Sequence, residues 1–143
     1  MLTVVAVLIV AVFLYWIFHR EKGHLTRLRQ VYREDALKFI YHQNEQGTPA
    51  TLSGIKGALS ISMSKVRTIV NELQQRQLVH VSDRGIEITE QGRQLVLNII
   101  RAHRIWETYL QHETDLPFHR IHQEADRKEH ELSREKLAAL DAH

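Results

Sequence analysis

The chain has 143 residues, enough for one compact domain of ordinary size together with an appendage. Its formal net charge is only +2, and it contains no cysteine, which excludes a disulfide framework and a thiolate zinc site. Any bound metal must therefore be held by nitrogen and oxygen donors, and the chain has 10 histidines to contribute.

An apolar run without charge or helix breaker opens the chain, from Leu2 to Phe18. As a helix it would span about 25 Å, slightly less than the ~30 Å hydrocarbon core of a bilayer. Basic residues follow it, which by the positive-inside rule places the C-terminal side in the cytoplasm. We therefore expect a transmembrane anchor over residues 1–19, a basic juxtamembrane connector over 20–32, and a single-pass membrane protein with a cytoplasmic C-terminal domain. Two alternatives are a buried core helix, which would need a large partner domain, and the last helix of a larger membrane protein.

The next segments have the periodicity of three amphipathic helices. Glu34–Gln46 carries an apolar stripe, a short helix is expected over Thr51–Leu59, and a longer one over Ser64–Gln77. The last two are separated by a few residues, and the second has a polar N-terminal half. This arrangement predicts a helix-turn-helix.

Residues 78–89 alternate apolar and polar side chains on both sides of Asp83-Arg84-Gly85. The pattern predicts a β-hairpin whose turn needs positive φ near Gly85, and hence a winged helix. Polar and basic side chains at the start of the second helix and at the wing tip suit phosphate and base-edge contacts with DNA. The candidate DNA-binding residues are Ser62, Ser64, Lys65, Arg67, Thr68 and Arg84. Many winged helices bind protein instead, so protein contact is the alternative.

A long helix is expected from Gln91 through Leu110, and Asp115-Leu-Pro117 ends it. A further helix should begin near His119, and Ser133 is placed to cap a last one over residues 134–143.

Two of these helices carry side chains at metal-ligand spacing. His122, Asp126 and Glu129 fall at i, i+4 and i+7 with His130 beside them, and His103 and Glu107 show the i, i+4 spacing one helix earlier. Imidazoles and carboxylates that converge from two helices could bind a divalent transition metal. The alternative is an ordinary solvated helix face, which a run rich in Glu, Arg and Lys also describes.

The order of helix-turn-helix, wing and two ligand-bearing helices resembles the diphtheria toxin repressor and manganese transport regulator family, from about Arg33 to His143. The most specific pieces are EDALKFIY (residues 34–41), RAHRIWE (101–107) and EADRKEHELS (124–133).

The resemblance implies a dimeric repressor that Mn²⁺ or Fe²⁺ activates. It assigns Asp35 as a ligand on the first helix and His103 as the ligand on the long helix. Asp126, Glu129 and His130 match the remaining main ligands, and Glu107 and His122 match ancillary positions. Lys38 stands where the manganese branch has a second carboxylate, so its ammonium either takes the place of a cation there or points away.

The predicted fold is mainly α with a small β-wing: one N-terminal transmembrane helix, a winged helix-turn-helix over residues 33–92, and a helical metal-binding and dimerisation domain over 93–143. The predicted function is a membrane-tethered, metal-dependent transcriptional regulator that binds DNA and forms a homodimer. The alternative is the cytoplasmic metal-sensing tail of a metal transporter, with the winged helix used for protein contact. An enzyme is not expected, because no nucleophile or oxyanion motif is present.

Overall fold

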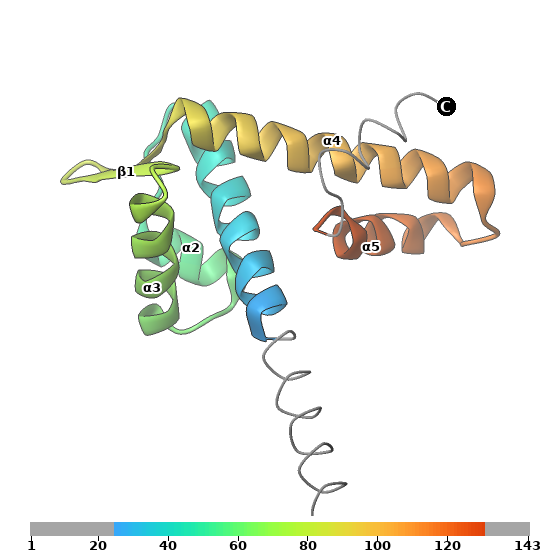
Figure 1. Cartoon of the computed structure of the whole chain (residues 1–143), viewed down its shortest axis with the longest axis horizontal. Helices are drawn as coiled ribbons and strands as arrows, with labels where there is room; N and C mark the ends of the chain where they lie inside the picture. Colours follow the sequence, from blue (N-terminus) through green and yellow to red (C-terminus); the bar gives the residue numbers. More distant parts are fainter. Residues whose placement is uncertain (1–24, 131–143) are drawn as a thin grey trace, which may run out of the picture. The chain divides into compact units, whose positions relative to one another are not determined.

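The computed structural model describes residues 25–130, which fold mainly into helices with one two-stranded sheet. A first helix occupies residues 25–45. It is followed by α2 (Leu52–Leu59), α3 (Met63–Gln75), β1 (Val79–Ser82), β2 (Gly85–Ile88), α4 (Glu90–Glu113) and α5 (Phe118–Glu129), as Figure 1 shows. The predicted succession of a helix, a helix-turn-helix, a hairpin and two further helices is confirmed. The helix expected over residues 134–143 lies outside the described residues.

Hydroxyl side chains cap three of these helices at their N-termini. Each accepts a hydrogen bond from a backbone N–H in the first turn, which otherwise has no partner inside the helix. The pairs are Thr51 with Gly54 at 3.0 Å, Ser62 with Lys65 at 3.3 Å and Thr89 with Gly92 at 3.1 Å. The starts of α2, α3 and α4 are therefore encoded locally.

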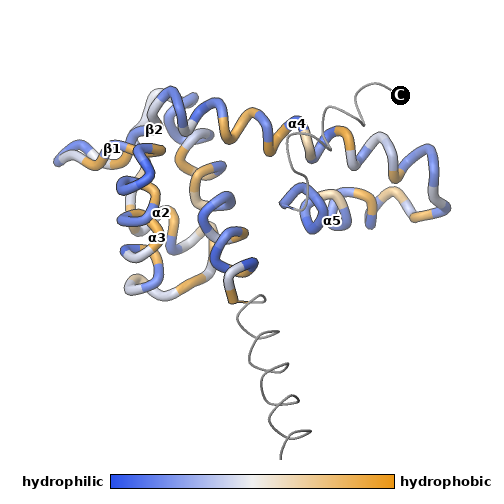
Figure 2. Tube along the Cα trace, in the orientation of Figure 1, coloured by the Kyte–Doolittle hydropathy of each residue, from blue (hydrophilic) through white to orange (hydrophobic). Residues whose placement is uncertain are grey.

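One apolar core joins residues 32–45 of the first helix to α2, α3, the hairpin and the start of α4. Its largest fully buried side chains are Leu37, Ile40, Ile55, Val66, Leu73 and Val96. A second, smaller cluster of Leu110, Ile121 and Ala125 packs α4 against α5. Along α4, apolar and hydrophilic positions alternate with the helical repeat (Figure 2), so the helix has an apolar face along its length. The first half of this face packs in the larger core, and the second half packs in the smaller cluster.

The hairpin is the predicted wing. β1 and β2 pair antiparallel, with Val79 opposite Ile88 and Ser82 opposite Gly85. Gly85 has φ +130°, which confirms the expected positive φ at the turn. Ala50 exchanges two backbone hydrogen bonds with Ile86, of 3.0 and 2.8 Å, so the wing is attached to the segment before α2.

Asn44 connects the first helix to the wing. Its amide nitrogen lies 3.2 Å from the carbonyl oxygens of Thr48 and Ile86, and its Oδ1 accepts from the Ile88 N–H at 2.6 Å. We expect Asn44→Ala to lower the free energy of unfolding by about 1–3 kcal/mol, because partly buried backbone groups lose their partner. Asn71 is exposed on α3, so Asn71→Ala is the matched control and should change the free energy of unfolding by less than about 0.5 kcal/mol. Equal losses in urea unfolding would contradict this role for Asn44.

The predicted membrane localisation is contradicted. Among residues 25–130, no helix is long and apolar enough to cross a bilayer. The physical reason is charge: the 24-residue helix α4 includes Arg93, Arg101, Arg104 and Glu107, and a charged side chain near the centre of a bilayer is costly. The segment over 1–19 that carried the prediction lies outside the described residues. Of the connector predicted over 20–32, residues 25–32 are helical and form the beginning of the first helix.

Candidate metal centre

α5 returns alongside α4 after the turn at residues 114–117 (Figure 1). Ala125 of α5 is completely buried against α4, and this close packing brings the polar residues on either side of the apolar contact together. Residues four apart lie on one face of a helix, so each helix presents its imidazole and carboxylate side chains to the other. The structure brings all seven predicted ligand residues into three groups of three, which overlap at His103 and at Glu129.

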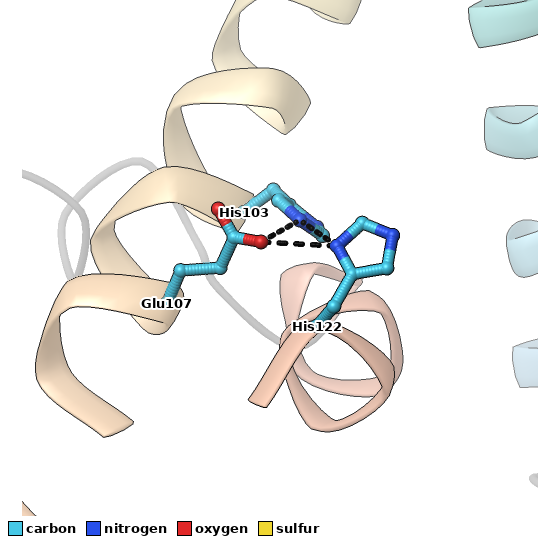
Figure 3. Close-up of side chains that lie close together, drawn as sticks. All are labelled: His103, Glu107 and His122. Carbon is cyan, nitrogen blue, oxygen red and sulfur yellow. Dashed lines mark hydrogen bonds and ion pairs between the residues drawn. The ribbon is translucent and has the colours of Figure 1, made fainter. Parts of the chain in front are cut away.

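The outer triad consists of His103 and Glu107 of α4 and His122 of α5 (Figure 3). His103 Nε2 lies 3.0 Å from Glu107 Oε1 and 3.1 Å from His122 Nδ1. His122 Nδ1 lies 3.0 Å from the same Glu107 oxygen. The three donor atoms therefore form a nearly equilateral triangle.

This triangle has the size that a divalent cation requires. Two ligands about 2.1 Å from an octahedral ion and at right angles to each other are about 3.0 Å apart. Two imidazole nitrogens and one carboxylate oxygen also form a borderline donor set without thiolates. The outer triad therefore fits one face of a six-coordinate site.

The inner group combines the other two triads, which share Glu129: Asp35 with Glu129 and His130, and Asp126 with Glu129 and His103. Asp35 comes from the first helix, and its Oδ1 lies 3.6 Å from His130 Nε2. Glu129 Oε1 lies 3.7 Å from the same nitrogen, and Glu129 is only 3% exposed. Oxygen donors from two distant segments meet here at one imidazole, which is a harder donor set than that of the outer triad.

His103 belongs to both groups. Its Nδ1 lies 2.8 Å from Glu129 Oε2 and 3.2 Å from Asp126 Oδ1, while its Nε2 faces the outer triad. When one ring nitrogen binds a metal, the other is commonly held by a carboxylate, which fixes the ring orientation. Glu129 is positioned to do this for His103.

The inner group has one contact that was not foreseen, from Glu34, and one that decides between the two alternatives for Lys38. Glu34 Oε2 lies 2.5 Å from His130 Nδ1, which leaves His130 Nε2 facing Asp35 and Glu129. Lys38 Nζ donates to Glu129 Oε1 at 2.7 Å. Of the two alternatives for Lys38, the structure shows the ammonium directed at the ligands.

The pKa values reflect a surplus of carboxylates. Burial raises the pKa of Asp35; His130 and Lys38 oppose this, and the neighbouring Glu129 and Asp126 add to it. Burial alone would lower the pKa of His130, but its hydrogen bond to Glu34 and the surrounding carboxylates raise it overall.

In the outer triad, the hydrogen bond between the two side chains raises the pKa of His122 and lowers the pKa of Glu107. Both groups therefore favour added positive charge, as a proton or a cation.

The candidate DNA-binding residues are all exposed, five of them at the start of α3 and one in the wing. Ser62, Ser64, Lys65, Arg67 and Thr68 lie over the first turns of α3, and Arg84 lies in the turn of the wing. The side chains of α3 that face the core are Val66, Ile69, Val70 and Leu73, so the patch at the start of α3 is the opposite, solvated face of the helix.

The first helix also contacts α3, through two residues that periodicity did not single out. Lys65 Nζ lies 3.6 Å from the ring centroid of Tyr32, and Arg33 Nη1 lies 2.9 Å from Glu72 Oε2. Tyr32 and Arg33 immediately precede Glu34 and Asp35, so neighbouring residues of one helix touch α3 and the inner group.

The sequence profile of the family described as "Iron dependent repressor, metal binding and dimerisation domain" matches residues 89–143. The diphtheria toxin repressor of Corynebacterium glutamicum is 37% identical over 100 residues, which are 69% of this chain and 44% of that protein. The iron-dependent repressor IdeR of Mycobacterium tuberculosis is 35% identical over 98 residues, 68% of this chain and 43% of that protein. The structure of the manganese regulator SloR matches with a TM-score of 0.67 and 30% identity, over 77% of this chain and 52% of that one.

The chain thus spans less than half the length of the two repressors. These relatives are repressors and a metal regulator rather than enzymes, as predicted, and iron and manganese are the metals that their names carry. None of the three is named as a transporter or a membrane protein, so the alternative prediction of a transporter tail is not favoured. By these matches, and by the fold and ligand-bearing helices described above, the chain is similar to the iron-dependent repressors, and residues 89–143 match their metal binding and dimerisation domain.

Proposed function

We propose that the chain is a metal-dependent DNA-binding transcriptional regulator, a repressor that Mn²⁺ or Fe²⁺ activates. The observation that carries the proposal is the convergence of seven imidazole and carboxylate residues in three overlapping triads, in a chain whose winged helix has exposed basic residues at the start of α3.

The donor chemistry supports these metals. His103, Glu107 and His122 would hold an ion in the outer triad, and Asp35, Asp126, Glu129 and His130 in the inner group. Nitrogen and carboxylate oxygen without sulfur suit Mn²⁺ and Fe²⁺, although the general affinity order favours Zn²⁺ and Cu²⁺ when these are available. A bound divalent cation would supply the positive charge that the clustered carboxylates need.

The first helix connects the inner group to α3, the helix that we propose reads DNA. Asp35 lies on the same helix as Tyr32 and Arg33, which contact Lys65 and Glu72 of α3. Holding Asp35 against His130 of α5 would fix the position of the helix on which α3 rests. Metal then favours one of two arrangements of α3 and α5, which is what a switch requires.

The patch on α3 would be the DNA-reading surface. In helix-turn-helix proteins the N-terminal residues of the second helix reach base edges. Ser62, Ser64 and Thr68 can form hydrogen bonds to phosphates, and Lys65 and Arg67 add charge. Arg84 would meet the backbone or minor groove beside the wing.

We further propose that the chain acts as a homodimer. The family description names dimerisation together with metal binding for residues 89–143. Large apolar side chains there remain exposed in the single chain: Leu97 at 46%, Tyr109 at 45% and Phe118 at 83%. Such side chains would be covered by a second copy.

Selection of bound duplexes from a random DNA library, with Mn²⁺ or Fe²⁺ and with EDTA, tests the function. We expect enrichment of defined sequences only with metal, followed by at least about a tenfold loss of affinity in Lys65→Glu and Arg67→Glu. Arg76→Glu, an exposed residue at the C-terminal end of α3, is the matched control and should bind like the wild type. Absence of any enriched duplex at saturating Mn²⁺ and Fe²⁺ would refute the proposed function.

A further inference from the structure

Lys38 and His103 share the most buried carboxylate of the metal centre. Lys38 Nζ lies 2.7 Å from Glu129 Oε1, and His103 Nδ1 lies 2.8 Å from Glu129 Oε2. The Glu129 side chain is 1% exposed and the Lys38 side chain 23% exposed. A carboxylate taken out of water needs such partners, so the ammonium has a defined place inside the inner group.

The oxygen that Lys38 holds is also the one that faces His130. Glu129 Oε1 lies 3.7 Å from His130 Nε2, and Asp35 Oδ1 lies 3.6 Å from the same nitrogen. A metal ion held by Asp35, Glu129 and His130 would therefore use the oxygen to which the ammonium is bound. Two cations at one oxygen repel each other strongly in a site with little water.

We infer that Lys38 is a tethered competitor for metal at this site: its ammonium must leave Glu129 Oε1 before Asp35, Glu129 and His130 can bind an ion together. The inference rests on the proposed function and adds how its metal threshold is set. Lys38 follows Asp35 by three residues, about one helical turn. Without metal, the first helix is linked to α5 by the contact of Lys38 with Glu129. With metal, the link would run through an ion that Asp35 binds, one turn away on the same helix.

Lys38 occupies no donor atom of the outer triad, although its charge opposes the rise in the pKa of His122. The three donor atoms of the triad are Glu107 Oε1, His103 Nε2 and His122 Nδ1, and Lys38 is hydrogen-bonded to none of them. The chain would therefore bind a first ion in the outer triad and a second in the inner group only at higher metal concentration.

The first test measures Mn²⁺ binding by electron paramagnetic resonance of the free ion. A His122→Ala background disables the outer triad and isolates the inner group. There, Lys38→Gln should tighten Mn²⁺ binding roughly ten- to a hundredfold, the value of a hydrogen bond to a charged group. Lys38→Arg keeps the positive charge and should therefore keep the weaker Mn²⁺ affinity. Lys128 is next to Glu129 in the sequence, but its ammonium lies over the Trp106 ring, so Lys128→Gln is the matched control and should change the Mn²⁺ affinity little. Unchanged or weaker binding in a folded Lys38→Gln protein would overturn the inference.

The second test uses the unmutated chain, so it holds even where Lys38→Gln does not fold. An amine-reactive reagent and mass spectrometry report the reactivity of each lysine with and without Mn²⁺. Lys38 should become more reactive as the inner group fills, while the exposed Lys56 of α2 stays constant. Unchanged or lower reactivity of Lys38 at saturating Mn²⁺ would overturn competition and leave the proposed function standing. Absence of Mn²⁺ and Fe²⁺ binding altogether would overturn both.

Discussion

Replacing Glu129 by glutamine is expected to weaken Mn²⁺ binding to the inner group by more than about a hundredfold. Loss of a residue that only orients a ligand already costs about 10–100-fold, and Glu129 would be a ligand itself. The same change removes the negative charge that both Lys38 and His103 contact. Because the carboxylate is buried, we also expect a loss of about 1–3 kcal/mol in the free energy of unfolding without metal. Calorimetric titration and urea unfolding measure the two effects.

Glu124→Gln provides the matched control for this variant. It makes the same substitution on α5 at a carboxylate that pairs with Arg127 at 2.7 Å outside the metal centre. Its metal affinity should equal that of the wild type. If Glu129→Gln bound Mn²⁺ as tightly as Glu124→Gln, the inner group would not be the metal site.

Gly92→Ala is expected to be the most destabilising alanine substitution at a glycine of the described chain. A Cβ at position 92 would lie 2.1 Å from the Leu78 carbonyl oxygen and 2.9 Å from Ile88 Cγ1. The carbonyl cannot turn aside, because it accepts the Thr89 N–H at 3.0 Å where the wing joins α4. We expect a loss of about 3 kcal/mol or more, seen as a fall of roughly 10 °C in melting temperature.

Gly57→Ala should act in the opposite direction. Gly57 is exposed in the interior of α2, and an added Cβ would meet nothing within 4 Å. Alanine in a helix is more stable than glycine by about 0.5–1 kcal/mol. Similar melting temperatures for the two variants would show that the close approach of Gly92 to Leu78 is not a constraint on the fold.

Local signals were sufficient to predict most of the fold. Apolar side chains at helical spacing predicted α2, α3 and α4, and alternation on both sides of Gly85 predicted the wing. These features act over a few residues, so they can be recognised without knowing what packs against them. Helical spacing alone likewise places His103 with Glu107, and His122 with Asp126 and Glu129, on two faces that the structure brings together.

The long-range contacts were not predictable in the same way. Lys38 and Glu129 are 91 residues apart, and Glu34 and His130 are 96 apart. No periodicity relates such pairs, and Glu34 had no signal beyond its position next to Asp35. The membrane prediction rested on the apolar run over residues 1–19, which lies outside the described residues, and no helix within residues 25–130 is long and apolar enough to cross a bilayer.

The central claim is that the metal centre and the DNA-reading patch of α3 are coupled. Coupling is reciprocal, so a DNA duplex that binds the metal-loaded protein better must also tighten its metal binding. The most direct measurement is a Mn²⁺ titration of the full chain with and without a saturating duplex obtained from the selection. We predict that the duplex tightens Mn²⁺ binding about fivefold or more, and that Arg67→Glu, at an exposed position of α3, abolishes this effect while leaving Mn²⁺ affinity without DNA unchanged. Equal Mn²⁺ affinities of the wild-type chain with and without the duplex would contradict the account.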